Sequence, residues 1–200
     1  MGSMRLMCVA ALLALAATTA QAITFTVDAA NSSVALTETG SGFVCGITNC
    51  GVSAELAAGF GGTTFDLNNV GVSNSFDFLT FTGAGTGGVA YDITATLAFD
   101  PPNISTTGGG SGGALLFFGS IVGAILTWDD VPAKVILGDG SEVTVDFEGG
   151  IGLFLGNTVT TSASVTLDKV SAVPLPASAL MLLLGLGGLA AVSRFKKKAV

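Results

Sequence analysis

The chain lacks histidine and has little charge, and both shortages narrow the range of functions. Of its 200 residues, 10% are charged, none is histidine, and Trp and Tyr occur once each. Without histidine the chain cannot form a serine-type triad, a His-ligated zinc site or an imidazole acid/base catalyst. Seven basic residues are too few for nucleic-acid binding, so we expect no nucleic-acid partner. We also expect no enzymatic activity and no cofactor.

The charges that are present are segregated along the chain. Basic residues gather at the two ends, as Arg5 and as a cluster at 194–198. The segment 23–173 holds all 14 carboxylates and only two lysines, which gives this segment a net charge of −12. The sequence is therefore an acidic body between two short ends that are both basic and apolar. Ends of this kind usually insert into membranes or direct the chain to them.

The N-terminal end has the three parts of a secretory signal peptide. Arg5 precedes an apolar run at 6–17, and the small-residue site Ala20-Gln21-Ala22 follows it. We expect signal peptidase to cleave after Ala22. An uncleaved anchor is the alternative, but about twelve apolar residues are short for a hydrocarbon core of ~30 Å.

Two cysteines remain after that cleavage, which removes Cys8. Cys45 and Cys50 lie close together in an exported, glycine-flanked segment, and this spacing predicts a disulfide that closes a tight loop. A redox site would need a Cys-x-x-Cys motif, and a metal site would need further ligands. We therefore expect the bridge to be structural and to stabilise a local turn.

The C-terminal end changes composition abruptly at Val173. Pro174 and Pro176 oppose a helix, because proline lacks the N–H donor and disfavours the helical conformation in the residue before it. The apolar segment 177–193 is long enough, with its flanks, for one membrane-spanning helix. The basic cluster at 194–198 follows, and the positive-inside rule then places the acidic body outside the cytoplasm.

This order of prolyl motif, single span and basic cluster resembles the PEP-CTERM sorting domain in its VPLPA variant. The resemblance covers about 173–200. It implies that an exosortase, an integral-membrane cysteine transpeptidase, processes the tail of a protein exported by a Gram-negative bacterium. The recognition motif would be Val173, Pro174, Leu175, Pro176 and Ala177, and the retention signal would be Arg194, Lys196, Lys197 and Lys198.

Two other interpretations of the tail stay open. The segment from Leu175 to Ser178 is similar to the Leu-Pro-x-Thr-Gly motif of Gram-positive sortase substrates, although Ser178 and Ala179 replace its Thr and Gly. The tail could also be an unprocessed membrane anchor. Leu175 stands where the PEP form has glutamate, which leaves the cognate exosortase open.

Between the two ends, apolar residues recur at every second position, which is typical of β-strands. The alternation is clearest at 89–99 and recurs at 23–27, 75–82, 142–147 and 158–167. Asp139-Gly140 predicts a two-residue hairpin. We expect roughly nine to eleven short strands in an all-β fold, an antiparallel β-sandwich, with a jelly roll as one arrangement.

Three further segments of the body each carry a specific prediction. The apolar segment 115–128 could be a second membrane span, but its length and its glycines favour one or two fully buried core strands. The low-complexity segment 101–113 predicts a mobile surface loop. The segment 83–88 matches the glycine string of dinucleotide sites, but the strand pattern that follows it favours a simple turn.

The densest acidic stretch offers weak candidates for a Ca²⁺ site. Asp129, Asp130 and Asp139 lie in it, and carboxylate oxygens suit Ca²⁺. No Asp-x-Asp-x-Asp-Gly loop is present, so we expect solvated acids and no metal. Two carboxylates about 5 to 10 Å apart could also serve a secreted hydrolase, but the scarcity of Trp and Tyr opposes a sugar-cleaving cleft.

These patterns divide the chain into a signal peptide at 1–22, a secreted β-sandwich domain at 23–172 and a sorting tail at 173–200. We expect a non-catalytic protein of the cell envelope or extracellular matrix. Its partners would be signal peptidase, an exosortase, exopolysaccharide and, before processing, the membrane through the C-terminal helix. A carbohydrate- or calcium-binding module is the alternative function.

Overall fold

The computed structural model describes residues 22–152 and 156–171. The chain divides into two compact units, Met1–Val170 and Ser171–Val200, and all described residues except Ser171 belong to the first. The predicted signal helix and the predicted membrane span lie outside the described residues. Within the described ranges, no helix is long and apolar enough to cross a membrane.

The described part of the first unit consists of twelve strands and one short helix, which confirms the all-β prediction. Four strands have 12 to 14 residues, which is longer than the short strands expected. The elements are β1 (Ile23–Thr26), β2 (Ser33–Ser41), α2 (Cys45–Thr48), β3 (Gly51–Leu56), β4 (Thr64–Leu67), β5 (Ser73–Ala84), β6 (Gly87–Phe99), β7 (Ile104–Phe117), β8 (Ser120–Trp128), β9 (Ala133–Ile136), β10 (Glu142–Phe147), β11 (Gly150–Gly152) and β12 (Thr158–Lys169).

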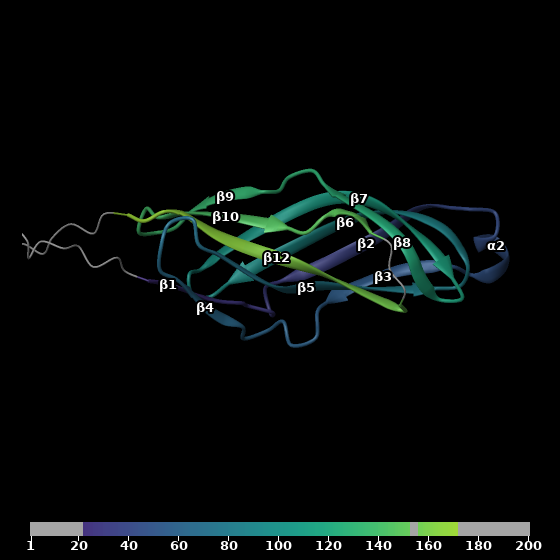
Figure 1. Cartoon of the computed structure of the whole chain (residues 1–200), viewed down its shortest axis with the longest axis horizontal. Helices are drawn as coiled ribbons and strands as arrows, with labels where there is room; N and C mark the ends of the chain where they lie inside the picture. The colour runs from purple at the N-terminus through teal and green to yellow at the C-terminus, as the bar shows by residue number, and fades with distance from the viewer. Residues whose placement is uncertain (1–21, 153–155, 172–200) are drawn as a thin grey trace, which may run out of the picture. The chain divides into compact units, whose positions relative to one another are not determined.

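Two five-stranded antiparallel sheets face each other in this unit (Figure 1). Sheet I has the order β3-β5-β12-β10-β9, sheet II has the order β11-β8-β7-β6-β2, and β1 pairs with β4 in a separate ribbon. The two sheets share one core, so the architecture is a β-sandwich. The strand order is not that of a jelly roll, because hairpins make β6, β7 and β8 consecutive neighbours within sheet II.

The core lies between the sheets and follows from the alternation of apolar residues. Six side chains of β6 are buried on one face: Val89, Tyr91, Ile93, Ala95, Leu97 and Phe99. Aromatic rings join the two sheets across the core. Phe81 of sheet I lies 6.2 Å from Tyr91 of sheet II, and Trp128 of sheet II lies 5.2 Å from Phe147 of sheet I, measured between ring centroids.

The glycine-rich segment 101–113 is mostly strand, so the prediction of a mobile surface loop is wrong. From Ile104 onward this segment is β7, which pairs with β6 on one side and β8 on the other. A Cβ atom added to Gly112 would lie 2.7 Å from the Tyr91 hydroxyl, because the ring lies directly against the strand. Glycine inside a strand marks such a close approach, which the local sequence does not reveal.

The apolar segment 115–128 forms the end of β7, a tight turn and β8, which confirms the prediction of strands. The strands are not fully buried, however. Leu116 and Ile121 face the core, whereas Leu115 and Phe117 are exposed. Successive side chains of a strand point to opposite faces, so a continuous apolar run places half of its side chains outside the core.

The two ends of the β domain are built differently. We call the end formed by β1, β4 and the last residues of β12 the terminal end (Figure 1). A cluster of phenylalanines closes the core there. The ring centroid of Phe25 lies 5.4 Å from the centroids of both Phe65 and Phe99, and Phe65 lies 5.7 Å from Phe76. Burial of these rings stabilises the terminal end.

Candidate functional site

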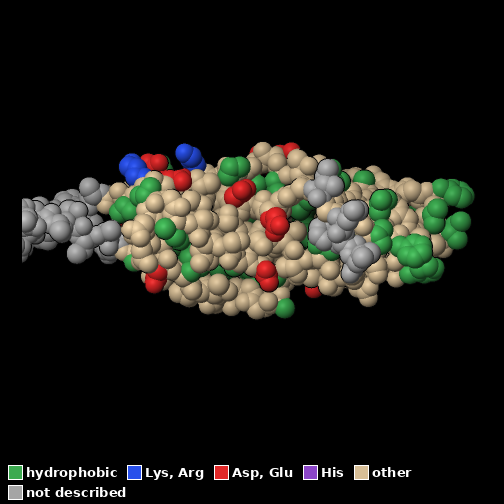
Figure 2. Space-filling model, in the orientation of Figure 1, with side chains coloured by type: hydrophobic (Ala, Val, Ile, Leu, Met, Phe, Trp, Pro, Cys, Tyr) green, Lys and Arg blue, Asp and Glu red, His purple; other side chains and the backbone are tan. Residues whose placement is uncertain are grey.

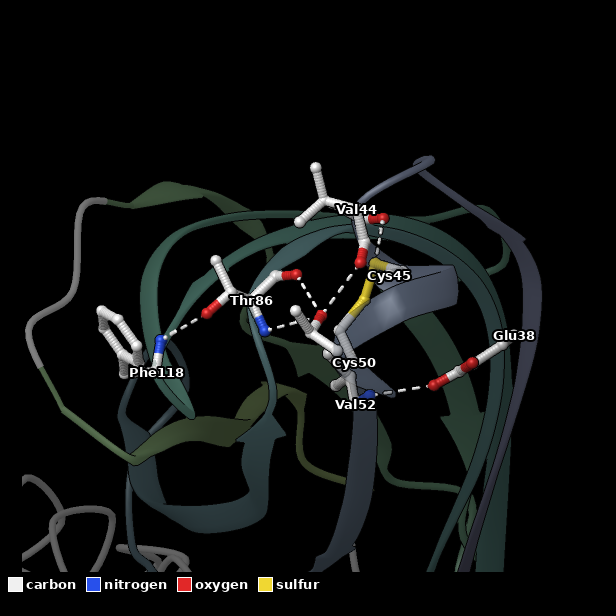
Figure 3. The surroundings of a disulfide bond; sticks show 9 residues. Glu38, Val44, Cys45, Cys50, Val52, Thr86 and Phe118 are labelled. Atoms are coloured by element: carbon white, nitrogen blue, oxygen red, sulfur yellow. Dashed lines mark hydrogen bonds between the residues drawn. A yellow bond between two sulfur atoms is a disulfide. The ribbon is translucent and has the colours of Figure 1, made fainter.

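The opposite end of the domain, where α2 lies in Figure 1, carries the disulfide, and Figure 3 shows its surroundings. Cys45 and Cys50 are bonded, which confirms the pairing expected from the sequence. Cys45 is the first residue of α2, and Asn49 ends this one-turn helix in the left-handed conformation with φ 48°. The bridge spans a sequence separation of 5, so its direct constraint is on this one turn of chain.

The glycine-rich turn between β5 and β6 lies directly against the disulfide. The turn predicted at 83–88 is confirmed at residues 85 and 86, whereas the flanking residues belong to the two strands. Gly85 and Gly87 have φ values of 70° and 146°. A Cβ atom at Gly85 would lie 2.7 Å from the Cys50 Cα, and one at Gly87 would lie 2.5 Å from the Cys45 Sγ. These glycines therefore allow the disulfide loop to pack on the turn.

Hydrogen bonds tie three loops together at this end (Figure 3). The Thr48 hydroxyl donates to the Thr86 carbonyl at 2.6 Å, and the Thr86 N–H donates back to that hydroxyl at 3.3 Å. The Phe118 N–H then donates to the Thr86 hydroxyl at 3.0 Å, and the Gly119 N–H donates to the Gly85 carbonyl at 2.7 Å. The disulfide loop, the β5–β6 turn and the β7–β8 turn thus form one connected unit.

Large apolar side chains project from this connected unit. Phe43 and Phe118 are 89% and 81% exposed, which is unusual for phenylalanine. In Figure 2, hydrophobic side chains gather at the end where Figure 1 places α2 and the β7–β8 turn. We call six exposed residues the apolar tip: Phe43, Val44, Ile47, Leu115, Phe117 and Phe118.

An open apolar groove adjoins the apolar tip on the outer face of sheet II. Its volume is about 690 Å³, and glycine, alanine and serine line most of it. Leu115 belongs to both the groove and the apolar tip, and Ile125 lines the groove on the neighbouring strand. Small residues such as Gly113 leave the space between these two side chains. The groove and the apolar tip therefore form a continuous uncharged surface.

The sequence carries no charge in the segments that build this surface. Charged residues are absent from 39–54, 78–91 and 101–128. The charged side chain bonded beside the tip is Glu38, whose carboxylate accepts a hydrogen bond from the Val52 N–H at 3.0 Å. On the face drawn in Figure 2, acidic and basic side chains lie toward the terminal end and the middle of the domain.

The weak Ca²⁺ candidates lie in two different turns. Asp129 and Asp130 follow β8, whereas Asp139 lies between β9 and β10. The Asp139 carboxylate accepts hydrogen bonds from the Ser141 N–H and hydroxyl, both at 2.9 Å. Among the described residues, no group of three or more Cys, Asp and Glu side chains is placed to hold a metal ion.

The hairpin predicted at Asp139-Gly140 is confirmed, but its connection is longer than two residues. β9 ends at Ile136 and β10 begins at Glu142, and these two residues pair. The Leu137 N–H donates to the Ser141 carbonyl at 2.8 Å, and Gly140 has φ 86°. Gly140 supplies the left-handed conformation that the turn requires.

A polar groove of about 310 Å³ lies on the outer face of sheet I. Asp146 and Glu148 line it together with Ser75, Ser162 and Ser164. One oxygen of the Glu148 carboxylate accepts a hydrogen bond from the Ser162 N–H at 2.8 Å. Carboxylates and hydroxyls of this kind can bind cations or the hydroxyl groups of a sugar.

A cavity of about 150 Å³ lies between the sheets, and its lining includes the exposed residues Glu148 and Gly150. Tyr91 lines it, and the Tyr91 hydroxyl donates a long hydrogen bond of 3.4 Å to the Ile125 carbonyl. Burial raises the pKa of Tyr91 above its ordinary value, because the interior disfavours the charged phenolate. The hydroxyl therefore stays protonated at neutral pH.

The β domain precedes a separate C-terminal unit, and the comparison of that tail with known families indicates the class of protein. The PEP-CTERM protein-sorting motif matches residues 172–198, which confirms the resemblance found in the sequence. This motif indicates an exosortase-targeted protein that is exported to the cell envelope. The match leaves the β domain outside it, and neither a curated protein nor a solved structure matches the chain.

The sorting residues lie outside the described part of the chain. The motif match includes Val173–Ala177 and the basic residues from Arg194 to Lys198. Of the signal-cleavage residues, Ala20 is also outside the described part, whereas Ala22 is exposed and directly precedes β1. Cleavage after Ala22 stays a prediction.

The apolar tip is the feature that the sequence analysis missed. Two signals could have indicated it. Phe117-Phe118 stands next to Gly119, and Phe43-Val44 directly precedes a disulfide, so both pairs lie where turns are expected. Large apolar residues at turns are exposed more often than those within strands.

Proposed function

We propose that this protein is a non-catalytic component of the cell envelope or of the extracellular polysaccharide matrix. Signal peptidase removes residues 1–22, and the apolar segment 177–193 then holds the chain in the inner membrane. An exosortase cleaves near Val173–Ala177 and releases the β domain from that anchor. The protein is thus the substrate of these cleavage reactions and catalyses none itself. The β domain acts through the interactions that its surface makes.

The observation that carries this proposal is the position of the sorting motif directly after a folded, disulfide-bonded domain. β12 ends at Lys169, and the motif match begins at residue 172. The domain before it is compact and acidic, and its one disulfide suits an oxidising compartment outside the cytoplasm.

The structural roles of the carboxylates support a non-catalytic domain. Asp139 is bonded within its turn, and the Glu142 carboxylate forms a 2.8 Å ion pair with Lys169. The Thr144 hydroxyl donates a hydrogen bond to the carboxylate of Asp168, and the Thr24 hydroxyl donates one to the carboxylate of Asp66. These contacts join neighbouring strands or stabilise turns.

A fractionation experiment tests the sorting step. We expect the double variant Pro174→Ala and Pro176→Ala to stay in the inner membrane, because both prolines of the recognition motif are lost. The wild-type protein and the control variant Ser178→Ala should be recovered from the outer envelope or the medium. Equal distribution of all three proteins would overturn the proposal.

A second candidate function is a carbohydrate- or calcium-binding module. The polar groove that holds Asp146 and Glu148 favours it. Binding would raise the melting temperature, because a ligand that binds only the folded state stabilises that state. An unchanged melting temperature in millimolar Ca²⁺ and in the presence of matrix glycans would remove this candidate.

A further inference from the structure

We propose that the apolar tip is a membrane-docking site that inserts into the surface of a neutral, zwitterionic phospholipid bilayer. The site goes beyond the sorting tail, because it belongs to the β domain that remains after processing. Its partner is a lipid surface, and the six side chains of the apolar tip make the contact.

The shape of the apolar tip fits a soft partner. Phe43, Ile47 and Phe118 are 89%, 74% and 81% exposed, so they stand out from the domain instead of forming a flat face. Protein partners usually require close shape complementarity, whereas a bilayer deforms around projecting side chains. Interfacial binding to membranes grows with the apolar area that enters the boundary between headgroups and acyl chains.

Four backbone N–H groups beneath these side chains are hydrogen-bonded within the protein, which lowers the cost of bringing them into lipid. The N–H groups of Ile47 and Thr48 donate to the Val44 carbonyl, both at 3.1 Å. The N–H groups of Phe118 and Gly119 donate to the β5–β6 turn. Polar groups without partners would be expensive to bury in hydrocarbon, and these four are satisfied within the protein.

The connected loops also keep the apolar side chains in place before they meet a membrane. The disulfide closes one loop, and the Thr48–Thr86 hydrogen bonds fix that loop to the β5–β6 turn. Because the loops are already ordered, docking does not need to order them, and less binding free energy is lost.

The distribution of charge indicates which type of lipid the apolar tip binds. The three tip loops contain no charged residue, and the segment 23–173 has a net charge of −12. Basic residues normally attract a domain to anionic lipid, and here none is present at the tip. The acidic body and the nearby Glu38 carboxylate are repelled by an anionic surface, so a neutral bilayer is the better partner.

The apolar tip lies at the end of the domain that is far from its chain ends. In sheet II, β6 and β7 pair from Gly87 and Leu116 near the tip to Phe99 and Ile104 at the terminal end. β12 ends at Lys169, beside β10, in the terminal end of Figure 1. The apolar tip and the last residues of β12 therefore lie at opposite ends of the β domain.

Vesicle sedimentation tests the proposal with native protein recovered from producing cells. We expect binding to phosphatidylcholine vesicles, and at least tenfold weaker binding for the double variant Phe43→Asp and Phe118→Asp. The matched control is Ile136→Asp, because Ile136 is 70% exposed but lies on the edge strand β9. This control should bind as the wild type does. Vesicles rich in phosphatidylglycerol should bind the wild type less well.

A fluorescent variant separates insertion of the tip from any binding by a retained tail. The chain has one Trp, so Phe118→Trp adds a second reporter that lies at the tip. Brominated acyl chains should quench this added signal and leave the signal of the wild-type Trp128 unchanged. No additional quenching in the variant would overturn the proposal. Self-association that the double Asp variant abolishes, without quenching by lipid, would instead identify a second copy as the partner.

Discussion

The terminal end and the apolar tip use the same residue type for opposite purposes. At the terminal end, Phe25 and Phe99 are almost completely buried and pack against other rings. At the apolar tip, Phe43 and Phe118 are almost fully exposed, and a disulfide with hydrogen-bonded loops holds the structure beneath them. Packed rings thus close the core at one end, and at the other end covalent and polar contacts hold the loops that carry the exposed rings.

This difference separates stability from binding within one small domain. Side chains that contribute to the core cannot be offered to a partner, because burial removes them from the surface. The apolar tip can present aromatic side chains only because other contacts order its loops. Substitutions at the two ends should therefore have very different effects on unfolding.

The largest contrast is expected from truncating one phenylalanine at each end. Phe25→Ala should lower the free energy of unfolding by about 3–5 kcal/mol, because it leaves a cavity among packed rings. Phe118→Ala should change it by no more than about 0.5 kcal/mol, since the ring is exposed. Urea denaturation, monitored by circular dichroism, measures the change in unfolding free energy for both variants. Equal losses at the two positions would show that the apolar tip is part of the core.

The glycine-rich strand between the two ends is the next place to test. Gly112→Ala should cost about 1–3 kcal/mol, because its Cβ would lie 2.5 Å from the Ile125 carbonyl oxygen and 2.7 Å from the Tyr91 hydroxyl. Gly138→Ala is the control, since a Cβ there meets no atom within 4 Å. The melting temperatures of the two variants compare their stabilities. A Gly112→Ala protein as stable as the control would contradict the packing of Tyr91 against β7.

Removing the disulfide should have a smaller and more local effect. The Cys45→Ala and Cys50→Ala double variant should lose about 2 kcal/mol, because a bridge across so short a loop constrains few residues of the unfolded chain. Hydrogen exchange should speed up in the three loops of the tip and stay unchanged at the terminal end. Uniform acceleration through both sheets would mean that the bridge stabilises the whole domain.

At neutral pH, Tyr91→Phe should have the smallest effect on the free energy of unfolding, because the hydrogen bond that it removes is long. Burial raises the pKa of Tyr91 in the folded state, so the protonated hydroxyl contributes stability below the unfolded pKa near 10. That contribution is lost as the pH rises through the higher folded pKa. Wild-type protein should therefore lose more stability above pH 10 than Tyr91→Phe does. Because the chain has one Tyr, the near-ultraviolet absorbance of tyrosinate reports this pKa directly.

Local pattern predicts much of the fold. The alternation at 89–99 predicted β6, and the spacing of Cys45 and Cys50 predicted the disulfide. The sequence could not reveal β7 as a strand, because three of its glycines, Gly108, Gly110 and Gly112, lie against aromatic rings of other strands, and these contacts are visible only in the structure. It also could not assign the exposed side of 115–128, since alternation shows that two faces exist but not which one meets solvent.

The intact mass of the native protein, measured without reduction, tests the central claim of export and tail removal most directly. The predicted result is one species that begins at Ile23, has Cys45 and Cys50 bonded, and ends near Val173–Ala177. The same mass fixes both chain ends, so it also reports whether signal peptidase has acted. A mature protein that still contains Lys196–Lys198 would contradict exosortase processing.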